Sequence, residues 1–457
     1  MIKYETDSRK VKPGQTFVTI KGYTVDGHDY IESAIKNGAD SIIAEKKVQV
    51  SVPVTVVKDS AKYFQEKLVK EYSDDFKKLK LIGITGTNGK TTSAYLTYQM
   101  LGKLGKKAAY MGTIGFMCGD YYEELPNTSP EILTIYKLLE MAIDKKCEYV
   151  VMEVSSHALD LKRIEGLSFE VCAFTNLTED HLDYHKTMDS YLDCKLMITD
   201  YLKDSGVMLV NKDDEASKKF MEKFSNTKTF GIGDATYDIR KFDIHPDHTD
   251  IEFKAYDENY EVTTNLTSKF NIYNYMTMFS IVHELGFKCE DIIEYTKDLK
   301  QPKGRCETYK VKDGFAVVDY AHTPDAVLKV VTAYKELAKA RVITLVGCGG
   351  DRDPMKRPIM GNIASEYSDY VIFTNDNPRT EDPENIMKDI LAGVKKDNYE
   401  VCLDRREAIK KALDMIQKDD IVLLLGKGHE DYQIIGHTKI HLDDSEEILK
   451  YVDNLKE

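Results

Sequence analysis

The sequence predicts an α/β protein with three domains. Three observations lead to this prediction: the chain has 457 residues, short apolar segments alternate with helical patterns along most of it, and one glycine-bearing loop joins an apolar strand to a helix. Such alternation is typical of mostly parallel sheets with helices on both faces. A charged stretch before residue 79 and a turn-rich segment after residue 300 suggest domains at residues 1–78, 79–302 and 303–457.

The first expected domain is small, with β-rich runs at residues 16–20, 41–44 and 52–57 and helical stretches at residues 30–37 and 61–72. In the second, apolar strands are expected at residues 79–84, 108–114, 149–154, 171–177 and 207–210. Alternating short strands with Asp and Asn turns follow at residues 238–270 and predict an antiparallel segment, before helices at residues 272–287 and 291–299. Each of these patterns fits an α/β domain.

The third expected domain resembles a Rossmann-like α/β arrangement. Its strands are expected at residues 316–321, 342–346, 370–374 and 421–425, and its helices at residues 326–337, 386–394, 408–416 and 446–455. Apolar strands separated by single helices predict a mostly parallel sheet here too.

Composition narrows the class of protein. The net charge of −14 disfavours nucleic acid and anionic lipid as partners. The eight cysteines are scattered without a C-x-x-C pair, which suits reduced thiols in a cytoplasmic protein better than disulfides or a zinc site. No apolar run approaches the roughly 18 residues of a membrane span, so we expect no membrane insertion.

The glycine-bearing loop predicts a phosphate-binding site. Residues 82–92 read IGITGTNGKTT, and an apolar-patterned helix follows. Glycines let backbone N–H groups face anionic oxygens, Lys90 adds a cation, and the hydroxyl of Thr91 or Thr92 can hold Mg²⁺. The loop is a variant of the P-loop pattern, because Ile84 stands where the first glycine is usual. A nucleoside triphosphate is the expected ligand, and an ordinary strand-to-helix turn is the alternative.

Polar clusters follow several of the expected strands. In the second domain, residues 153–157 (EVSSH) and 176–185 (NLTEDHLDYH) bring carboxylates and imidazoles to strand ends, where ligands of parallel sheets bind. Near phosphates these groups indicate Mg²⁺. In the third domain, residues 347–353, 376–379 and 426–430 suit a small zwitterion, with arginine for a carboxylate and glutamate for an ammonium. Each cluster alone could also be a solvated loop.

Together with residues 85–92 and 319–324 (DYAHTP), these clusters resemble the Mur ligase family. The resemblance implies an N-terminal UDP-sugar-binding domain, a central P-loop-type ATPase and a C-terminal domain that receives an amino acid. The implied reaction is ATP-dependent amide formation through an acyl phosphate, in peptidoglycan precursor synthesis and hence cell wall biogenesis. A cytoplasmic monomer that acts on small molecules is expected.

The resemblance also assigns nucleotide and metal residues. Lys90, Glu153, His181 and Lys195 would be catalytic, and Mg²⁺ would be held by Thr91, Glu153, His181 and Lys195. Lys195 matches a family lysine that CO₂ converts to a carbamate, which supplies oxygen ligands to a hard metal. The ATP-binding residues would be Gly86, Thr87, Asn88, Gly89, Lys90, Thr91, Thr92, Asn271, Asn274, Arg305 and Asp319.

Two further sites follow from the resemblance. The UDP-sugar would contact Ser8, Tyr23, Thr24, Val25, Asn127, Thr128, Ser129, Ser155 and Arg163. The amino acid would contact Arg357, Asp376, Asn377, Pro378, Arg379, Gly426 and Glu430.

Arg379 bears on the choice of amino acid. An arginine at this position can pair with the distal carboxylate of meso-diaminopimelate, whereas lysine offers no such group. In this family the form DNPR, found here at residues 376–379, is associated with meso-diaminopimelate. The resemblance therefore implies a reaction that adds meso-diaminopimelate to UDP-N-acetylmuramoyl-L-alanyl-D-glutamate. The alternatives are the same ligase with L-lysine or another diamino acid, a folylpolyglutamate-type or cyanophycin-type ligase, and a homologue without catalytic activity.

Overall fold

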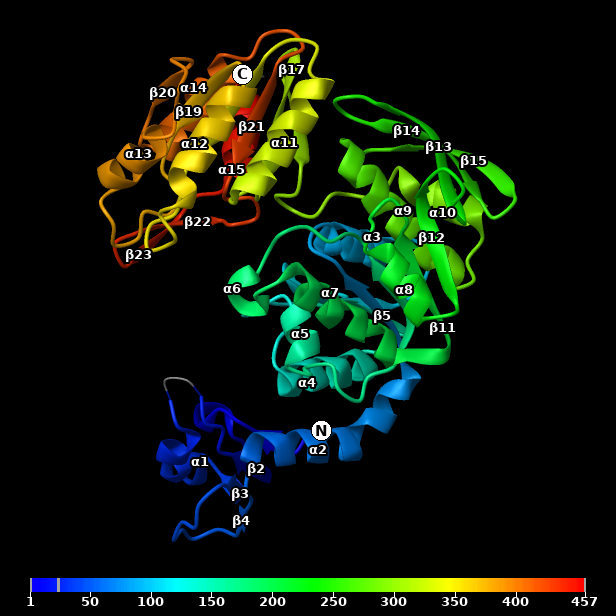
Figure 1. Cartoon of the computed structure of the whole chain (residues 1–457). Coiled ribbons are helices and arrows are strands. Elements are labelled where there is room, and N and C mark those ends of the chain that lie inside the picture. Colours follow the sequence, from blue (N-terminus) through cyan, green and yellow to red (C-terminus); the bar gives the residue numbers. More distant parts are fainter. Residues whose placement is uncertain (1, 23–24, 456–457) are drawn as a thin grey trace. The chain divides into compact units, whose positions relative to one another are not determined.

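The computed structural model, drawn in Figure 1, describes residues 2–22 and 25–455. Its chain divides into two compact units. Unit 1 contains the chain up to residue 231 together with residues 277–292, and unit 2 contains residues 232–276 and 293–457. Both units combine helices with mostly parallel sheets, so the predicted α/β class is confirmed.

The start of unit 1 is a four-stranded parallel sheet in the order β1-β2-β3-β4. Phe17, Ile31 and Ile42 form a small core on one side of it. On α2, Phe64 and Leu68 pack into the larger core of the unit, and Asp59 caps that helix by accepting from Lys62 N. The elements are β1 (Tyr4–Glu5), β2 (Gln15–Val18), β3 (Ala39–Ala44), β4 (Val54–Val56), α1 (Ile31–Lys36) and α2 (Ser60–Tyr72).

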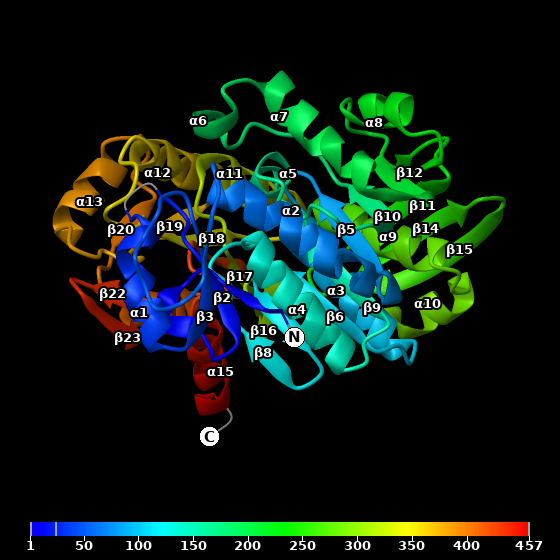
Figure 2. The ribbon, with the colours of Figure 1, turned by 90° about the horizontal axis from the view of Figure 1, so that it is seen from below.

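The larger sheet of unit 1 has the strand order β12-β11-β10-β5-β9-β6-β7-β8. Its strands pair in parallel from β12 to β6, and β7 and β8 add an antiparallel edge. Figure 2 shows β5, β10 and β11 in that order across the sheet. The strands are β5 (Lys80–Thr85), β6 (Ala108–Gly112), β7 (Gly115–Cys118), β8 (Tyr121–Glu123), β9 (Tyr149–Glu153), β10 (Phe169–Phe174), β11 (Leu202–Asn211) and β12 (Thr227–Ile232).

The helices of unit 1 follow strand ends. β5 and β9 are almost entirely buried, as expected for strands covered on both faces. The central position of β5 places the loop after it among the ends of its neighbours β9 and β10. The helices are α3 (Lys90–Lys103), α4 (Ile132–Asp144), α5 (Ser156–Asp160), α6 (Leu182–His185), α7 (Met188–Leu196) and α8 (Ser217–Lys223).

Unit 2 begins with the predicted antiparallel segment. Strands β13 (Tyr237–Ile244), β14 (Thr249–Ala255) and β15 (Glu258–Thr264) pair antiparallel in that order. Helices α9 (Lys269–Glu284) and α10 (Cys289–Thr296) follow, and the chain passes between the two units within them.

The larger sheet of unit 2 has the order β16-β17-β21-β18-β19-β20, and only β16 runs antiparallel to its neighbour. A separate hairpin joins β22 to β23. The strands are β16 (Glu307–Val311), β17 (Gly314–Asp319), β18 (Val342–Val346), β19 (Tyr370–Phe373), β20 (Tyr399–Val401), β21 (Ile421–Leu425), β22 (Tyr432–Ile435) and β23 (Thr438–His441).

Successive residues of a strand point to opposite faces of the sheet, and helices cover both of these faces. Val317 and Leu423 pack against α11, α12 and α13, which lie side by side in Figure 1. Val318 and Leu424 pack on the other face with α14 and α15. The helices are α11 (Pro324–Leu337), α12 (Lys356–Tyr367), α13 (Pro383–Leu391), α14 (Arg405–Asp414) and α15 (Asp444–Asn454).

Two predictions from composition can be compared with the structure. All eight cysteines are buried free thiols. Cys118 and Cys147 lie closest, with a sulfur-to-sulfur distance of 3.1 Å. Across the described part of the chain, no helix has both the length and the apolarity that a membrane span requires.

Candidate active site

The loop after β5 forms the base of the candidate site. Gly86 has a φ of +143° and Gly89 a φ of +85°. Residues other than glycine rarely adopt these backbone conformations. Lys90 begins α3, and its Nζ donates to the carbonyl oxygens of Gly86 and Thr87 at 2.8 Å each. The sequence therefore folds here into a compact turn that ends at a helix N-terminus, as a phosphate-binding loop requires.

The segment after β10 holds this loop in place. Thr87 N donates to Asn176 O at 2.8 Å, and Asn88 N donates to Asn176 Oδ1 at 2.9 Å. Asn88 Nδ2 donates to Thr178 Oγ1 at 3.1 Å. The two predicted motifs, residues 86–92 and 176–185, therefore meet in space. Thr175, which sequence reasoning missed, adds a 2.6 Å bond from its hydroxyl to Asn88 O.

Glu153, at the end of β9, is the buried carboxylate nearest to the start of α3. Its Oε2 accepts from Thr91 Oγ1 at 2.9 Å, and its Oε1 accepts from Thr113 N at 2.9 Å and from the Tyr110 hydroxyl. Tyr110 and Thr113 were not predicted from the sequence. Their only signal was their place at the end of the neighbouring strand β6. Hydroxyl and carboxylate oxygens in this arrangement are the ligand types that Mg²⁺ takes.

Lys195 is buried, although other residues of its helix α7, such as Asp189 and Asp193, are exposed. Its Nζ donates to Gly86 O at 2.9 Å and lies 4.3 Å from the centre of the Tyr191 ring. Burial, and secondarily the Lys90 ammonium, hold the pKa of Lys195 well below the ordinary value for lysine. The structure therefore favours a neutral amine at the phosphate loop.

His181 lies in a separate cluster of rings. It precedes α6 with a φ of +54°, and its Nε2 is 3.5 Å from Asp180 Oδ2. Its ring is 5.0 Å from that of His157, whose pKa is lowered mainly by burial. Tyr191, 6.4 Å away between ring centres, connects this cluster to Lys195. Among the described residues, no direct bond joins His181 to Glu153.

The residues expected at the UDP-sugar lie in two parts of unit 1. Ser129 Oγ donates to Glu153 O at 2.8 Å and accepts from Ser155 N at 3.1 Å. Arg163 donates to Ser129 O at 2.9 Å, and Thr128 bonds Thr113 at 3.0 Å. These four therefore gather beside the Glu153 site, and exposed Asn127 precedes them.

Ser8 and Val25 belong to the part of unit 1 that contains the four-stranded sheet. Ser8 is buried, and its carbonyl accepts from Asn37 Nδ2 at 2.8 Å. Val25 is exposed. Tyr23 and Thr24 lie outside the described residues.

The remaining nucleotide candidates belong to unit 2. On α9, Asn274 Nδ2 donates to Asn271 Oδ1 at 2.8 Å, and both residues are buried. Asp319 accepts from Cys306 N at 2.9 Å, and its pKa is raised by burial against the opposing effect of Arg305. The Arg305 guanidinium lies 5.0 Å from the centre of the Tyr320 ring. The phosphate-loop residues and these candidates thus lie in different units.

Buried polar atoms without a hydrogen-bond partner mark this part of unit 2. They include Arg305 Nε, His429 Nδ1 and both amide atoms of Gln301. Burial, then Arg305 and other cations, lower the pKa of His429 to about 4, so it is neutral at pH 7. Unpartnered buried polar atoms are costly, and a polar ligand is one way to satisfy them.

The loops after β19 and β21 bring the amino-acid candidates together. Asn377 Nδ2 donates to Glu430 Oε2 at 2.8 Å, and a Cβ at Gly426 would lie 2.8 Å from Asp376 Oδ2. Pro378 follows in the same loop, and Arg379 NH1 donates to Gly350 O at 2.7 Å. Six of the seven expected residues, all except Arg357, therefore lie in the loops at these two strand ends.

Arg357 is engaged differently. Its guanidinium is buried and pairs with Asp389 at 2.9 Å and with Glu381 at 2.8 Å. Its NH2 group also reaches Gly349 O at 3.3 Å. Two carboxylates thus balance its charge, so in this structure Arg357 supports the loop that Arg379 also contacts.

Replacing Gly86 with alanine is expected to destabilise the loop and to weaken nucleotide binding. The new Cβ would lie 2.0 Å from Thr175 Oγ1 and 3.1 Å from Asn176 N, at a strained φ of +143°. Strain of this kind costs about 1–3 kcal/mol. Thermal unfolding and binding of a fluorescent ATP analogue measure the two effects. Gly105→Ala is the matched control, because its φ is +74° and no atom lies within 4 Å of the added Cβ. An unfolding midpoint for Gly86→Ala no lower than for this control would contradict the prediction.

The fold and the loop after β5 define a nucleotide-binding α/β protein of the P-loop type. Three family models match the chain: "Mur ligase family, catalytic domain" at residues 4–75, "Mur ligase middle domain" at residues 84–282, and "Mur ligase, glutamate ligase domain" at residues 304–428. The chain belongs to the Mur ligase family.

Curated relatives are similar over nearly the full length. A UDP-N-acetylmuramoyl-L-alanyl-D-glutamate--2,6-diaminopimelate ligase of Clostridium botulinum is 41% identical, over 98% of this chain and 94% of the relative. A ligase of the same name from Fusobacterium nucleatum is 42% identical, over 97% of this chain and 92% of the relative.

Solved structures agree in fold. The structure of a protein with that same name matches with a TM-score of 0.72 and 30% identity, over 99% of this chain and 95% of the other. MurF ligase from Thermotoga maritima in complex with ADP matches with a TM-score of 0.68 and 21% identity, over 93% and 94% of the two chains. A folylpolyglutamate synthase of Mycobacterium tuberculosis matches at 14% identity, which bears on fold alone.

Proposed function

We propose that this protein is an ATP-dependent ligase that joins meso-diaminopimelate to UDP-N-acetylmuramoyl-L-alanyl-D-glutamate in peptidoglycan precursor synthesis. The names of the relatives that are 41% and 42% identical support the substrates. The observation that carries the chemistry is the meeting of the phosphate loop with Lys195 and, through Thr91, with Glu153. We further propose that it acts in the cytoplasm as a monomer, with domains at residues 1–78, 79–302 and 303–457.

Residues 86–92 would surround the ATP phosphates. Lys90 would exchange its loop carbonyls for the β and γ phosphates. Asn271, Asn274, Arg305 and Asp319 would contact the adenine, ribose and phosphates. Thr91, Glu153, His181 and Lys195 would hold Mg²⁺, and the oxygen donors already gathered at Glu153 fit that ion. Bound Mg²⁺ would neutralise charge that develops on the phosphoryl oxygens.

Lys195 would act as a carbamate. A neutral amine is needed to attack CO₂: its nitrogen forms a bond to the carbon and loses one proton, which leaves an anionic carbamate. The lowered pKa of Lys195 supports this step, because burial disfavours the ammonium form, which cannot react. The carbamate would then place negative oxygens where a cationic side chain would repel a metal.

The reaction would proceed in two steps. The substrate carboxylate would attack the γ phosphorus, forming an acyl phosphate and releasing ADP. The amine of diaminopimelate would attack the carbonyl carbon, and phosphate would leave from the tetrahedral intermediate. Positioning and charge neutralisation would supply the catalysis, with no protein nucleophile.

The two substrates would bind at the sites described above. The UDP-sugar would contact Ser8, Tyr23, Thr24, Val25, Asn127, Thr128, Ser129, Ser155 and Arg163. The diamino acid would contact Arg357, Asp376, Asn377, Pro378, Arg379, Gly426 and Glu430. Asn377 and Glu430, which bond each other at 2.8 Å, offer two groups that suit an amino acid. The amide of Asn377 can donate to its carboxylate, and the carboxylate of Glu430 can accept from its ammonium group.

A phosphate-release assay tests the proposal. The protein is mixed with UDP-N-acetylmuramoyl-L-alanyl-D-glutamate, ATP and Mg²⁺, and then with meso-diaminopimelate, L-lysine or L-ornithine. We expect release that depends on the dipeptide substrate and on meso-diaminopimelate. Release with lysine alone would overturn the specificity, and no release with any amine would favour a homologue without catalytic activity. Folate with glutamate serves as the control for a folylpolyglutamate-type activity.

A further inference from the structure

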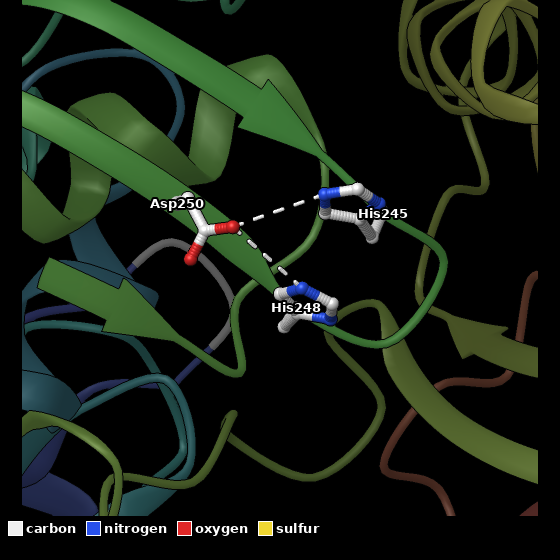
Figure 3. A group of neighbouring side chains, drawn as sticks. All are labelled: His245, His248 and Asp250. Atoms are coloured by element: carbon white, nitrogen blue, oxygen red, sulfur yellow. Dashed lines mark ion pairs between the residues drawn. The ribbon is translucent and has the colours of Figure 1, made fainter.

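The turn between β13 and β14 brings two imidazole rings together. His245 and His248 flank Pro246 and Asp247, and His245 N donates to His248 O at 2.8 Å, which closes the turn. The rings stack with centres 4.3 Å apart and planes 18° from parallel (Figure 3). The backbone of a tight β-turn thus fixes both rings side by side.

A single carboxylate oxygen faces both rings. Asp250 Oδ2 lies 3.8 Å from His245 Nε2 and 3.8 Å from His248 Nε2, as Figure 3 shows. The other oxygen, Asp250 Oδ1, accepts from Thr263 Oγ1 on β15 at 2.5 Å. Thr263 therefore holds the carboxylate with its free oxygen toward the imidazoles. One ligand atom from each of the three residues lies within 4.8 Å of the others.

Two more carboxylates surround this triad. Asp247 Oδ1 is 2.7 Å from His248 Nδ1, which directs Nε2 of that ring toward Asp250. Asp243 Oδ2 is 3.5 Å from His245 Nε2. A carboxylate on the far nitrogen of a histidine is a common means of orienting a metal-binding imidazole.

The three side chains can be compared with the ligands of a metal site. Asp250 Oδ2 faces Nε2 of both rings, so one divalent ion can lie among a carboxylate oxygen and two imidazole nitrogens. In a tetrahedral zinc site with bonds of about 2.0–2.1 Å, ligand atoms lie roughly 3.3–3.4 Å apart. The two carboxylate-to-imidazole distances of 3.8 Å are close to this value. The stacked rings must turn about their side-chain bonds so that both ring planes meet at the ion.

We propose that His245, His248 and Asp250 form a binding site for a divalent transition-metal ion, with zinc as the fitting example. Two imidazoles and one carboxylate suit zinc better than Mg²⁺, which prefers oxygen ligands alone. Three protein ligands leave a fourth position for water. The site shares no residue with the proposed ligase site, and it stands or falls independently of that function.

Calorimetric titration with Zn²⁺ tests the site. The full chain is treated with EDTA, dialysed, and titrated in excess Mg²⁺, which occupies oxygen-donor sites. We expect the parent to bind one Zn²⁺. The affinity for this ion should fall at least tenfold in His248→Ala and in His248→Gln, which keeps a polar side chain of similar length. Asp247→Asn is expected to weaken it by about tenfold, because it orients a ligand without providing one. Binding should also weaken at pH 5.5 relative to pH 7.5, because the imidazoles must lose their protons.

The control is His441→Ala. His441 is an exposed histidine with a carboxylate partner, Glu446, at 2.8 Å. It should leave Zn²⁺ binding unchanged, and circular dichroism checks that every variant is folded. Equal Zn²⁺ affinity and stoichiometry in the parent and in both His248 variants would overturn the proposal, as would equal losses in the His441 and His248 variants.

Discussion

Replacing Lys195 with alanine is expected to abolish ligase turnover, a loss of at least about 100-fold, while the fold stays intact. The residue is buried at the phosphate loop, 2.9 Å from Gly86 O, and its pKa is well below the ordinary lysine value. Alanine offers no amine to react with CO₂ and so removes the proposed carbamate ligand. Phosphate release measures the loss, and circular dichroism checks the fold.

Carbon-13 NMR separates the carbamate from a merely structural role for this lysine. Parent protein incubated with ¹³C-bicarbonate should show a carbamate resonance that is absent in Lys195→Ala. Lys218→Ala, which changes an exposed lysine of α8, is the control and should keep both the resonance and the activity. Full turnover in the Lys195 variant would remove the carbamate from the mechanism.

Replacing Arg379 with alanine is expected to lower kcat/KM for meso-diaminopimelate by about 10- to 100-fold, the effect of losing a charged hydrogen bond. Arg379 is half-buried, with a φ of +51°. Its NH1 bonds Gly350 O at 2.7 Å, beside the Asn377–Glu430 pair. A guanidinium held in this way has further N–H groups for the distal carboxylate of the substrate. Steady-state kinetics with varied diaminopimelate measure the change.

Comparison with L-lysine sharpens this second test. Lysine lacks the distal carboxylate, so any slow reaction with it should change little in Arg379→Ala. Arg406→Ala is the control, because Arg406 pairs with Glu447 on the surface of α14 and α15. Unchanged kinetics for diaminopimelate in the Arg379 variant would show that another residue selects the substrate.

Much of the fold could be predicted from the sequence. The apolar runs at β5, β9, β17, β18 and β21 gave strands within a few residues of the observed ones. The antiparallel segment at residues 237–264 was predicted correctly from alternation. Strands β7, β8, β16, β22 and β23 were missed, because strands of three to five residues are too short to show a periodic pattern. Helices α4 and α12 were not predicted either.

Only part of each candidate site could be predicted from the sequence. Their motifs stand out because glycine, lysine and carboxylate residues cluster at strand ends. Tyr110 and Thr113 lack such a motif, yet both bond Glu153. Nor could the sequence reveal that Arg357 pairs with Glu381 and Asp389.

The sequence by itself determined the α/β class and the loop at residues 82–92, because strand, turn and helix preferences act between near neighbours in the chain. Only the tertiary structure decided what surrounds that loop. The parallel order β10-β5-β9 brings Asn176 and Glu153 to it from distant segments. Burial of Lys195 is likewise decided by packing, and its lowered pKa follows from the lost solvation of the charged form.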